Sequence, residues 1–214
     1  MKIVNSEVKV ISIPAIDIRH VTFKVVGDTP LIMHAWDVKV KQEMLDKMMG
    51  KAKSKMRELK DPVRDFIASM YWLSGAPVDN PTEEGFAKAI ESGGASFGFP
   101  SVAFKASAVS AGYRAKVTKD KVSMQGAFHI DGEFVTIDGV PRMREDMVRV
   151  ANGAPDIRYR GEFPEWSANI TVKYNAGVVS DEQIANLFNL GGFACGVGEW
   201  RAEKGGNFGM YHVE

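Results

Sequence analysis

The pattern of apolar and polar residues predicts a strand at the start of the chain and a long helix after it. β-Branched residues, partly alternating with polar ones, run from Val8 to Val26 on both sides of Pro14, which is typical of extended structure. From Val38 to Leu59, apolar side chains recur with the 4-3-4-3 spacing of an amphipathic helix. The residues that carry this spacing are Leu45, Met49, Ala52, Met56 and Leu59.

Further helices are expected downstream of this first one. Asp61-Pro62 is a favourable helix start, because proline suits the first helical position, and the apolar residues that follow extend this helix to Leu73. A short helix is predicted at Glu83–Glu91, inside a stretch rich in Gly, Pro and acids. Residues 37–98 are therefore interpreted as a mostly helical insertion.

The second half of the chain predicts a helix, several strands and a final helix. Ser101 to Ala115 forms a slim helix of small residues, and Asp131-Gly132 lies between two alternating runs, a hairpin signal. The charged stretch 142–149 is compatible with strand or loop. Strands are expected at 157–163 and 166–174. Ser180 is a good N-cap for the last helix, because acids and Gln183 follow it.

A glycine-rich segment follows that last helix. Seven glycines fall within residues 191–213, which indicates a tight backbone path rather than packed core. Gly196 and Gly198 are expected to adopt positive φ or to admit a close backbone. A short closing strand is predicted around Tyr211.

The order helix, glycine-rich loop, final strand resembles the RAMP superfamily, the RNA-binding proteins of CRISPR effector complexes. The residues that carry the resemblance are Gly196, Gly198, Arg201, Gly205, Gly206, Phe208 and Gly209. The resemblance implies an α+β, ferredoxin-like (RRM-like) antiparallel sheet with two packing helices. It also implies a single RAMP-like domain over residues 1–214, related to the crRNA-binding backbone subunits, with a phage gene as a hypothesis for its origin.

Composition changes this interpretation in one respect. The 27 Lys and Arg residues balance the 27 Asp and Glu residues, so any nucleic-acid binding requires a local cluster of basic residues.

The single Cys195 excludes an internal disulfide and a multi-cysteine zinc site. The sequence contains neither a signal peptide nor a long apolar run, so we expect a cytoplasmic protein without membrane association.

Three groups of residues are candidates for contact with nucleic acid. Lysines at i, i+4 and i+8 of the first helix form a stripe, for which ordinary solvation of a helix face is the alternative. Arg158 and Arg160 share one strand face, where pairing with Glu162 and Glu165 is the alternative. We predict that the stripe and the glycine-rich loop form one continuous basic track. The helix and loop members are Lys47, Lys51, Lys55, Arg57, Gly196, Gly198, Trp200, Arg201, Lys204, Gly205 and Gly206.

The search for catalytic chemistry is negative. No Walker loop, nucleophile elbow or His-Glu-x-x-His motif is present, and the four histidines lack metal-ligand spacing. His34 and Asp37 occupy the position after the first strand where some RAMP nucleases carry a catalytic residue, but a packing role is favoured for His34. We expect neither enzyme activity, nor a cofactor, nor a metal.

The function predicted from these features, and mainly from the resemblance, is binding of single-stranded nucleic acid. RNA is favoured over DNA, and the protein is expected to act as a homo-oligomer of repeated subunits along the strand or as a subunit of a larger assembly. Two alternatives stay open. One is a protein-binding mimic or inhibitor of a CRISPR-type effector complex, and the other is a phage structural or assembly protein.

Overall fold

The computed structural model describes residues 15–51, 59–149 and 153–214, which form a mixed α+β structure with antiparallel sheets. The six α-helices found in these residues are α1 (Val38–Met48), α2 (Pro62–Ala68), α3 (Glu83–Glu91), α4 (Ser101–Arg114), α5 (Lys121–Ala127) and α6 (Asp181–Ala194). The strands are β1 (Ile18–Gly27), β2 (Leu31–Met33), β3 (Tyr71–Ser74), β4 (Ser96–Pro100), β5 (Phe128–Ile130), β6 (Phe134–Ile137), β7 (Arg142–Arg149), β8 (Pro155–Phe163), β9 (Ser167–Asn175) and β10 (Tyr211–Val213).

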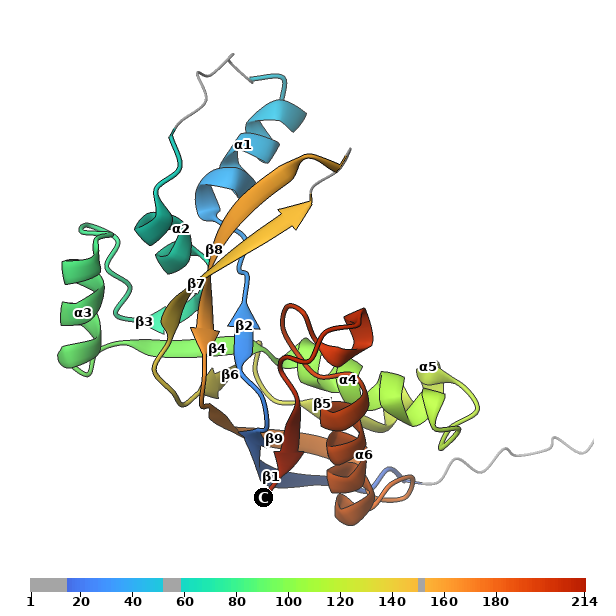
Figure 1. The fold of residues 1–214 in the computed structure, drawn as a ribbon. Helices are drawn as coiled ribbons and strands as arrows, with labels where there is room; N and C mark the ends of the chain where they lie inside the picture. Colours follow the sequence, from blue (N-terminus) through green and yellow to red (C-terminus); the bar gives the residue numbers. More distant parts are fainter. Residues whose placement is uncertain (1–14, 52–58, 150–152) are drawn as a thin grey trace, which may run out of the picture.

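The largest sheet has the strand order β10-β1-β9-β5, and every neighbouring pair is antiparallel. Its centre is the long β1–β9 pair, in which Phe23 lies opposite Ile170. Helices α4 and α6 lie side by side and pack on this sheet through apolar residues, including the Phe23–Phe188 contact (Figure 1). Gly191 of α6 makes the helix contact close, because a Cβ there would lie 2.8 Å from the Ala108 backbone nitrogen.

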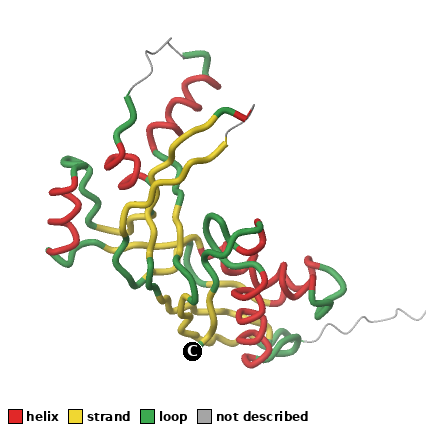
Figure 2. Tube along the Cα trace, in the orientation of Figure 1, coloured by secondary structure: helices red, strands yellow, loops and turns green. Residues whose placement is uncertain are grey.

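Two smaller sheets, β2-β8-β7 and β3-β4-β6, extend the molecule away from the largest one. The β7–β8 hairpin projects beyond the body as an arm, with α1 and α2 near it (Figures 1 and 2). The base of the hairpin is packed on the α2 side, since a Cβ on Gly161 would lie 2.5 Å from the Met70 side chain. Farther along the same side Met147 and Ile157 are exposed, so only the base of the arm is covered there.

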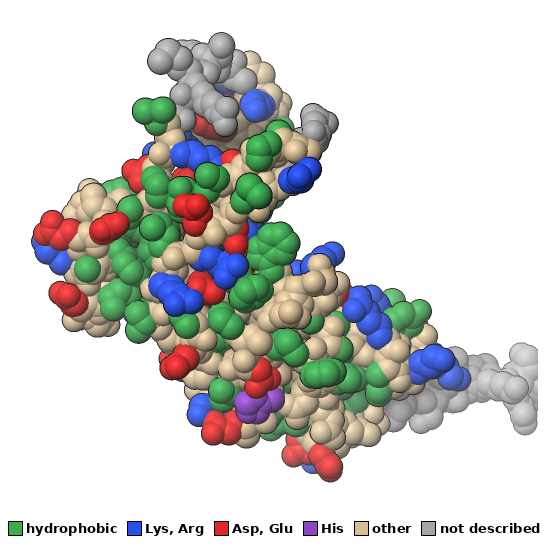
Figure 3. Space-filling view, viewed as in Figure 1, with side chains coloured by type: hydrophobic (Ala, Val, Ile, Leu, Met, Phe, Trp, Pro, Cys, Tyr) green, Lys and Arg blue, Asp and Glu red, His purple; other side chains and the backbone are tan. Residues whose placement is uncertain are grey.

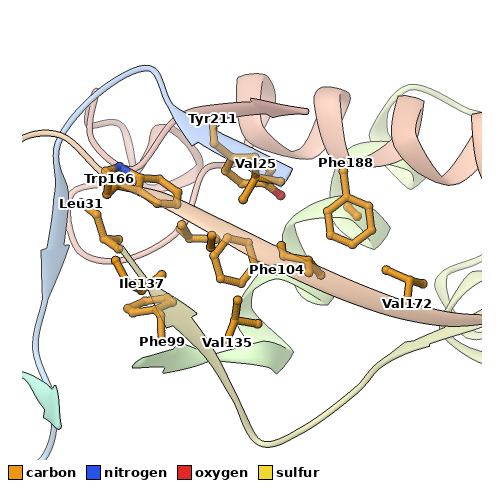
Figure 4. Close-up of a cluster of buried hydrophobic side chains, with 14 of the residues drawn as sticks. Val25, Leu31, Phe99, Phe104, Val135, Ile137, Trp166, Val172, Phe188 and Tyr211 are labelled. Carbon is orange, nitrogen blue, oxygen red and sulfur yellow. The ribbon is translucent and has the colours of Figure 1, made fainter. Parts of the chain in front are cut away.

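One hydrophobic cluster connects the sheets and the two main helices (Figure 4). Phe104 of α4 is fully buried and contacts both Trp166 and Tyr211 at ring-centroid distances of 6.3 and 5.6 Å. The Tyr211 hydroxyl lies 2.6 Å from the Ser107 hydroxyl, so the polar atom of this buried ring is satisfied. Burial raises the pKa of Tyr211 well above its ordinary value.

The predicted helices at 83–91 and 101–115 and the Ser180 N-cap are confirmed, the last as a complete capping box with Gln183. The strand predictions over 157–163 and 166–174 are confirmed as β8 and β9, and 142–149 is strand β7.

Three sequence predictions are corrected. The helix expected over 38–59 ends at Met48, because Gly50 takes a φ of +70° just after it; residues 52–58 lie outside the described part. The helix expected through Leu73 ends at Ala68, and β3 follows, so the 37–98 segment contains strands as well as helices. The Asp131-Gly132 turn does not close a hairpin. The strands before and after it join different sheets, β5 with β9 and β6 with β4.

Within the described residues, none of the helices has both the length and the apolar character needed to cross a membrane.

Candidate nucleic-acid interface

The loop between α6 and β10 follows a path that only glycine permits at several points. Gly196 and Gly198 have φ values of 66° and 82°, which confirms the expectation of positive φ. A Cβ on Gly198 would lie 2.6 Å from the Ile32 carbonyl oxygen, and one on Gly209 would lie 1.7 Å from the Val197 carbonyl oxygen. The loop is therefore held against β2 and against itself by close backbone contacts.

This path of the loop places the Trp200 side chain at the surface. Trp200 itself has a φ of 52°, rare for a residue with a bulky side chain. Its carbonyl oxygen accepts a hydrogen bond from the Phe208 amide at 3.1 Å and lies so close to Gly206 that any Cβ there would clash. The indole is 41% exposed, so the backbone positions an aromatic ring at the surface.

The β7–β8 arm carries a charged face. Because strand side chains alternate, every second residue of each strand points to the same side. The register places Arg142 opposite Glu162, Arg144 opposite Arg160, and Asp146 opposite Arg158. This face therefore has four arginines and three acids, because Asp156, opposite Val148, lies on it as well and pairs with Arg158 at 3.6 Å.

Two of these acids, Asp146 and Glu162, form ion pairs with Arg142, Arg144 and Arg160. Arg160 is only 2% exposed and donates to Asp146 at 3.0 Å, while Glu162 accepts from Arg142 at 2.7 Å and from Arg144 at 3.0 Å. Burial alone would lower the pKa of Arg144, but its bonds to the two carboxylates outweigh this effect and raise it. The Arg142 side chain keeps 66% of its surface exposed.

Direct contacts join the arm to the glycine-rich loop. The Arg144 guanidinium lies over the Phe208 ring, 4.6 Å from its centroid, and Arg160 pairs with Glu199 at 3.6 Å. These contacts place the charged face of the arm beside the loop. Arg142 on the arm and Trp200 on the loop therefore belong to adjoining elements.

On its other side, the loop is joined to the end of α4. Glu203 accepts from Arg114 at 2.8 Å and pairs with Arg201 at 3.2 Å. Just beyond Arg114, Lys116 and Lys119 are exposed in the connection to α5. Neither of these lysines, nor Lys204 of the loop, has a carboxylate at ion-pairing distance among the described residues. Asp120, which lies between them in sequence, caps α5 through Ser123.

Together these elements form what we call the basic face, which runs from the arm across the loop to the α4–α5 connection. It consists of Arg142, Arg158, Arg201, Lys204, Arg114, Lys116, Lys119 and Lys121. Figure 3 shows Lys and Arg side chains along this side, on both flanks of the notch between arm and body. Exposed aromatic rings lie on the same elements: Trp200, and Tyr113, which Lys121 covers at 5.5 Å from the ring centroid.

The structure brings some of the predicted residues together and separates others. The predicted residues that lie on the arm or the loop are Arg158, Gly196, Gly198, Trp200, Arg201, Lys204, Gly205 and Gly206. The prediction that Arg160 contacts nucleic acid is corrected, because its burial in ion pairs leaves no surface for a phosphate. Its partners are Asp146 and Glu199 rather than the expected Glu162 or Glu165.

The expected continuation of the track onto α1 is not seen. Lys47 is in the last turn of α1, at the tip of the molecule remote from the loop (Figure 1), and Lys51 follows three residues after the helix ends. Lys55 and Arg57 lie outside the described residues. The loop instead adjoins the arm on one side and Arg114 on the other.

His34 and Asp37 lie in the connection between β2 and α1. The Asp37 side chain caps α1 by accepting from the Lys39 amide at 2.7 Å. His34 borders a hollow of about 230 Å³ behind the loop, and burial, followed by the charge of Arg160, lowers the pKa of its imidazole. The described residues contain no cluster of three His, Cys, Asp or Glu that could hold a metal.

Sequence reasoning missed Arg142, Arg144, Arg114 and the lysines of the α4–α5 connection. For Arg142 and Arg144 a signal existed, since 142–149 alternates charges in the way a strand with one charged face would. No comparable sequence signal exists for Arg114, because its role depends on a contact with Glu203, 89 residues away.

No protein-family model matches the chain, and no curated protein matches it. Among solved structures, the chain is similar to the crystal structure of Cmr6 from Pyrococcus furiosus, with 10% sequence identity and a TM-score of 0.44. The similarity covers 94% of this chain and 100% of that chain. This level of similarity establishes neither family nor function, so membership of the RAMP superfamily stays a prediction.

Proposed function

We propose that the protein binds single-stranded nucleic acid along the basic face, as a non-catalytic binder. The observation that carries this proposal is the separation of charge in a chain of zero net charge. Asp146 and Glu162 of the arm and Glu203 of the loop are held by Arg144, Arg160 and Arg201, and exposed cations remain on both sides of the notch. At physiological salt the Debye length is about 8 Å, so acids elsewhere on the surface cancel little of this local field.

A single strand suits this surface better than a duplex. Trp200 and Tyr113 offer aromatic faces on which unpaired bases can stack, and the neighbouring cations can follow the phosphates. We favour RNA over DNA from the resemblance of the loop to RNA-binding proteins, and we extend the proposal to repeated copies along one strand.

The proposal includes the fold. In chain order, β1, α4, β5, β9, α6 and β10 follow a βαββαβ pattern, and the sheet order places the last strand beside the first. This arrangement supports a ferredoxin-like unit, with the arm and the 37–98 segment as additions to it.

The test compares two double variants with equal loss of charge. Lys116→Ala with Lys204→Ala removes two exposed cations of the basic face, whereas Lys24→Ala with Lys88→Ala removes two surface cations on β1 and α3. Fluorescence anisotropy with labelled RNA and DNA single strands is measured across salt concentrations. For the first variant, we expect weaker binding and a log–log salt slope that is shallower by about 1.4, at about 0.7 per phosphate contact. Equal behaviour of both variants would contradict the proposal.

A second function, binding of a protein partner, is favoured by a different surface. Helix α1 exposes Val40, Met44, Leu45 and Met48, the last at 85%. An apolar helix face of this kind commonly marks a contact with another protein. A partner that still binds after Met44→Lys and Met48→Lys would exclude α1 as that surface.

A further inference from the structure

One edge of the largest sheet is open. Strand β1 pairs with β9 from Ile18 to Val26, but on its other side β10 pairs only with Val25, Val26 and Gly27. Among the described strands, none pairs with residues 18–23 on that side. An unpaired row of backbone N–H and C=O groups is a ready template for another strand.

The exposure of the β1 side chains changes at Val25, where pairing with β10 starts. On the face that packs against the helices, Val25, which has β10 beside it, is 0% exposed. Val21 and Phe23 on the same face are only half-buried, although Phe23 contacts the buried Phe188. The core is therefore incompletely covered along the open edge, where an added strand would lie.

The chain itself contains a segment that matches this edge. Residues 8–13, Val-Lys-Val-Ile-Ser-Ile, are as long as the open stretch 18–23 and rich in β-branched residues. In the connection from 14 to 17, the described residues 15–17 contain neither a turn nor a bend, and the Asp17 carbonyl accepts from the Ala176 amide at 2.7 Å. The described part of the connection therefore contains no turn of the kind that folding back onto the chain's own open edge requires.

We propose that residues 8–13 of a second copy of this chain add as an antiparallel strand to residues 18–23. In such a pairing Val8 and Val10 can lie beside Phe23 and Val21, cover their exposed portions, and supply hydrogen-bond partners to the edge. Each copy has one donor segment and one acceptor edge, which are different surfaces. The contact can therefore repeat from copy to copy.

A disulfide trap distinguishes exchange between copies from folding back within one chain. The natural Cys195 is fully buried, so it gives little background. Ile11→Cys and His20→Cys are made in separate chains and then mixed under mild oxidation. His20 is exposed on β1. We expect a disulfide-linked pair of chains in the mixture. A chain carrying both substitutions should give a ladder of linked chains on a non-reducing gel.

Neighbouring positions (Val10→Cys and Thr22→Cys) allow for a shift of register. A cross-linked monomer in the double variant, with no pair in the mixture, would show pairing within one chain and overturn the proposal, as would no cross-link in any combination. A chain lacking residues 1–14 should show a lower, concentration-independent mass by light scattering with unchanged circular dichroism. A peptide of residues 1–16 should bind it, and the same peptide with Val10→Pro should not. These outcomes require no nucleic acid, so they are independent of the proposed function.

Discussion

Replacing Gly198 by alanine should destabilise the protein more than the same change at Gly205. The two glycines have nearly equal φ values, 82° and 79°, so alanine meets the same backbone penalty at both, about 1–2 kcal/mol for a left-handed residue. Their surroundings differ. A Cβ at Gly205 meets nothing within 4 Å, whereas one at Gly198 lies 2.6 Å from the Ile32 carbonyl oxygen and 2.8 Å from Leu31 Cδ1.

Relieving that contact requires the loop to move from β2, which would break the Glu199 amide bond to the Ile32 carbonyl, now 3.0 Å long. Overpacking of this kind costs about 1–3 kcal/mol beyond the backbone penalty. Urea unfolding followed by circular dichroism measures the difference. With a slope of about 2 kcal/mol/M, Gly198→Ala should lower the midpoint by about 0.5–1.5 M more than Gly205→Ala. Equal midpoints would refute the close docking of the loop on β2.

Three further predictions concern buried polar groups. Burial, aided by the charge of Arg160, lowers the pKa of His34 below its ordinary value of 6.5. The unfolded chain therefore binds the proton first, and urea midpoints should fall as pH drops below about 6.5, less so in His34→Gln. Tyr211→Phe removes the buried hydroxyl bonded to Ser107 and should cost about 1–2 kcal/mol in the same assay. Arg160→Met should cost about 3–5 kcal/mol because it leaves Asp146 buried with one partner fewer, and adding Asp146→Leu should restore part of it.

The sequence predicted those elements whose signals are local. The Ser180 capping box, the 83–91 helix that Thr82 caps, and the positive φ of Gly196 and Gly198 all follow from residues within a few positions of one another. Gly191 behaves differently: the glycine count places it in the loop, but it lies in α6, where the lack of a side chain lets α4 approach closely.

The failures are tertiary in origin. The runs around Asp131-Gly132 alternate like a hairpin, yet each finds a longer partner elsewhere, β9 for one and β4 for the other. The two arginines of β8 look equivalent in sequence, but the register brings Asp146 and the loop residue Glu199 to Arg160, which buries it. Half of the candidate site was therefore predictable as a loop with exposed cations, and the half contributed by the arm and α4 depends on long-range contacts.

The most direct test of the central claim locates bound RNA on the surface. A single-stranded RNA carrying photoreactive 4-thiouridine is bound, irradiated and digested, and the linked peptides are identified by mass spectrometry. We predict adducts on Trp200 and Tyr113 and on peptides from the loop and the α4–α5 connection, and their loss in Lys116→Ala with Lys204→Ala. Adducts confined to α1, α3 or the outer side of β1, or RNA binding without any adduct on the basic face, would contradict the account.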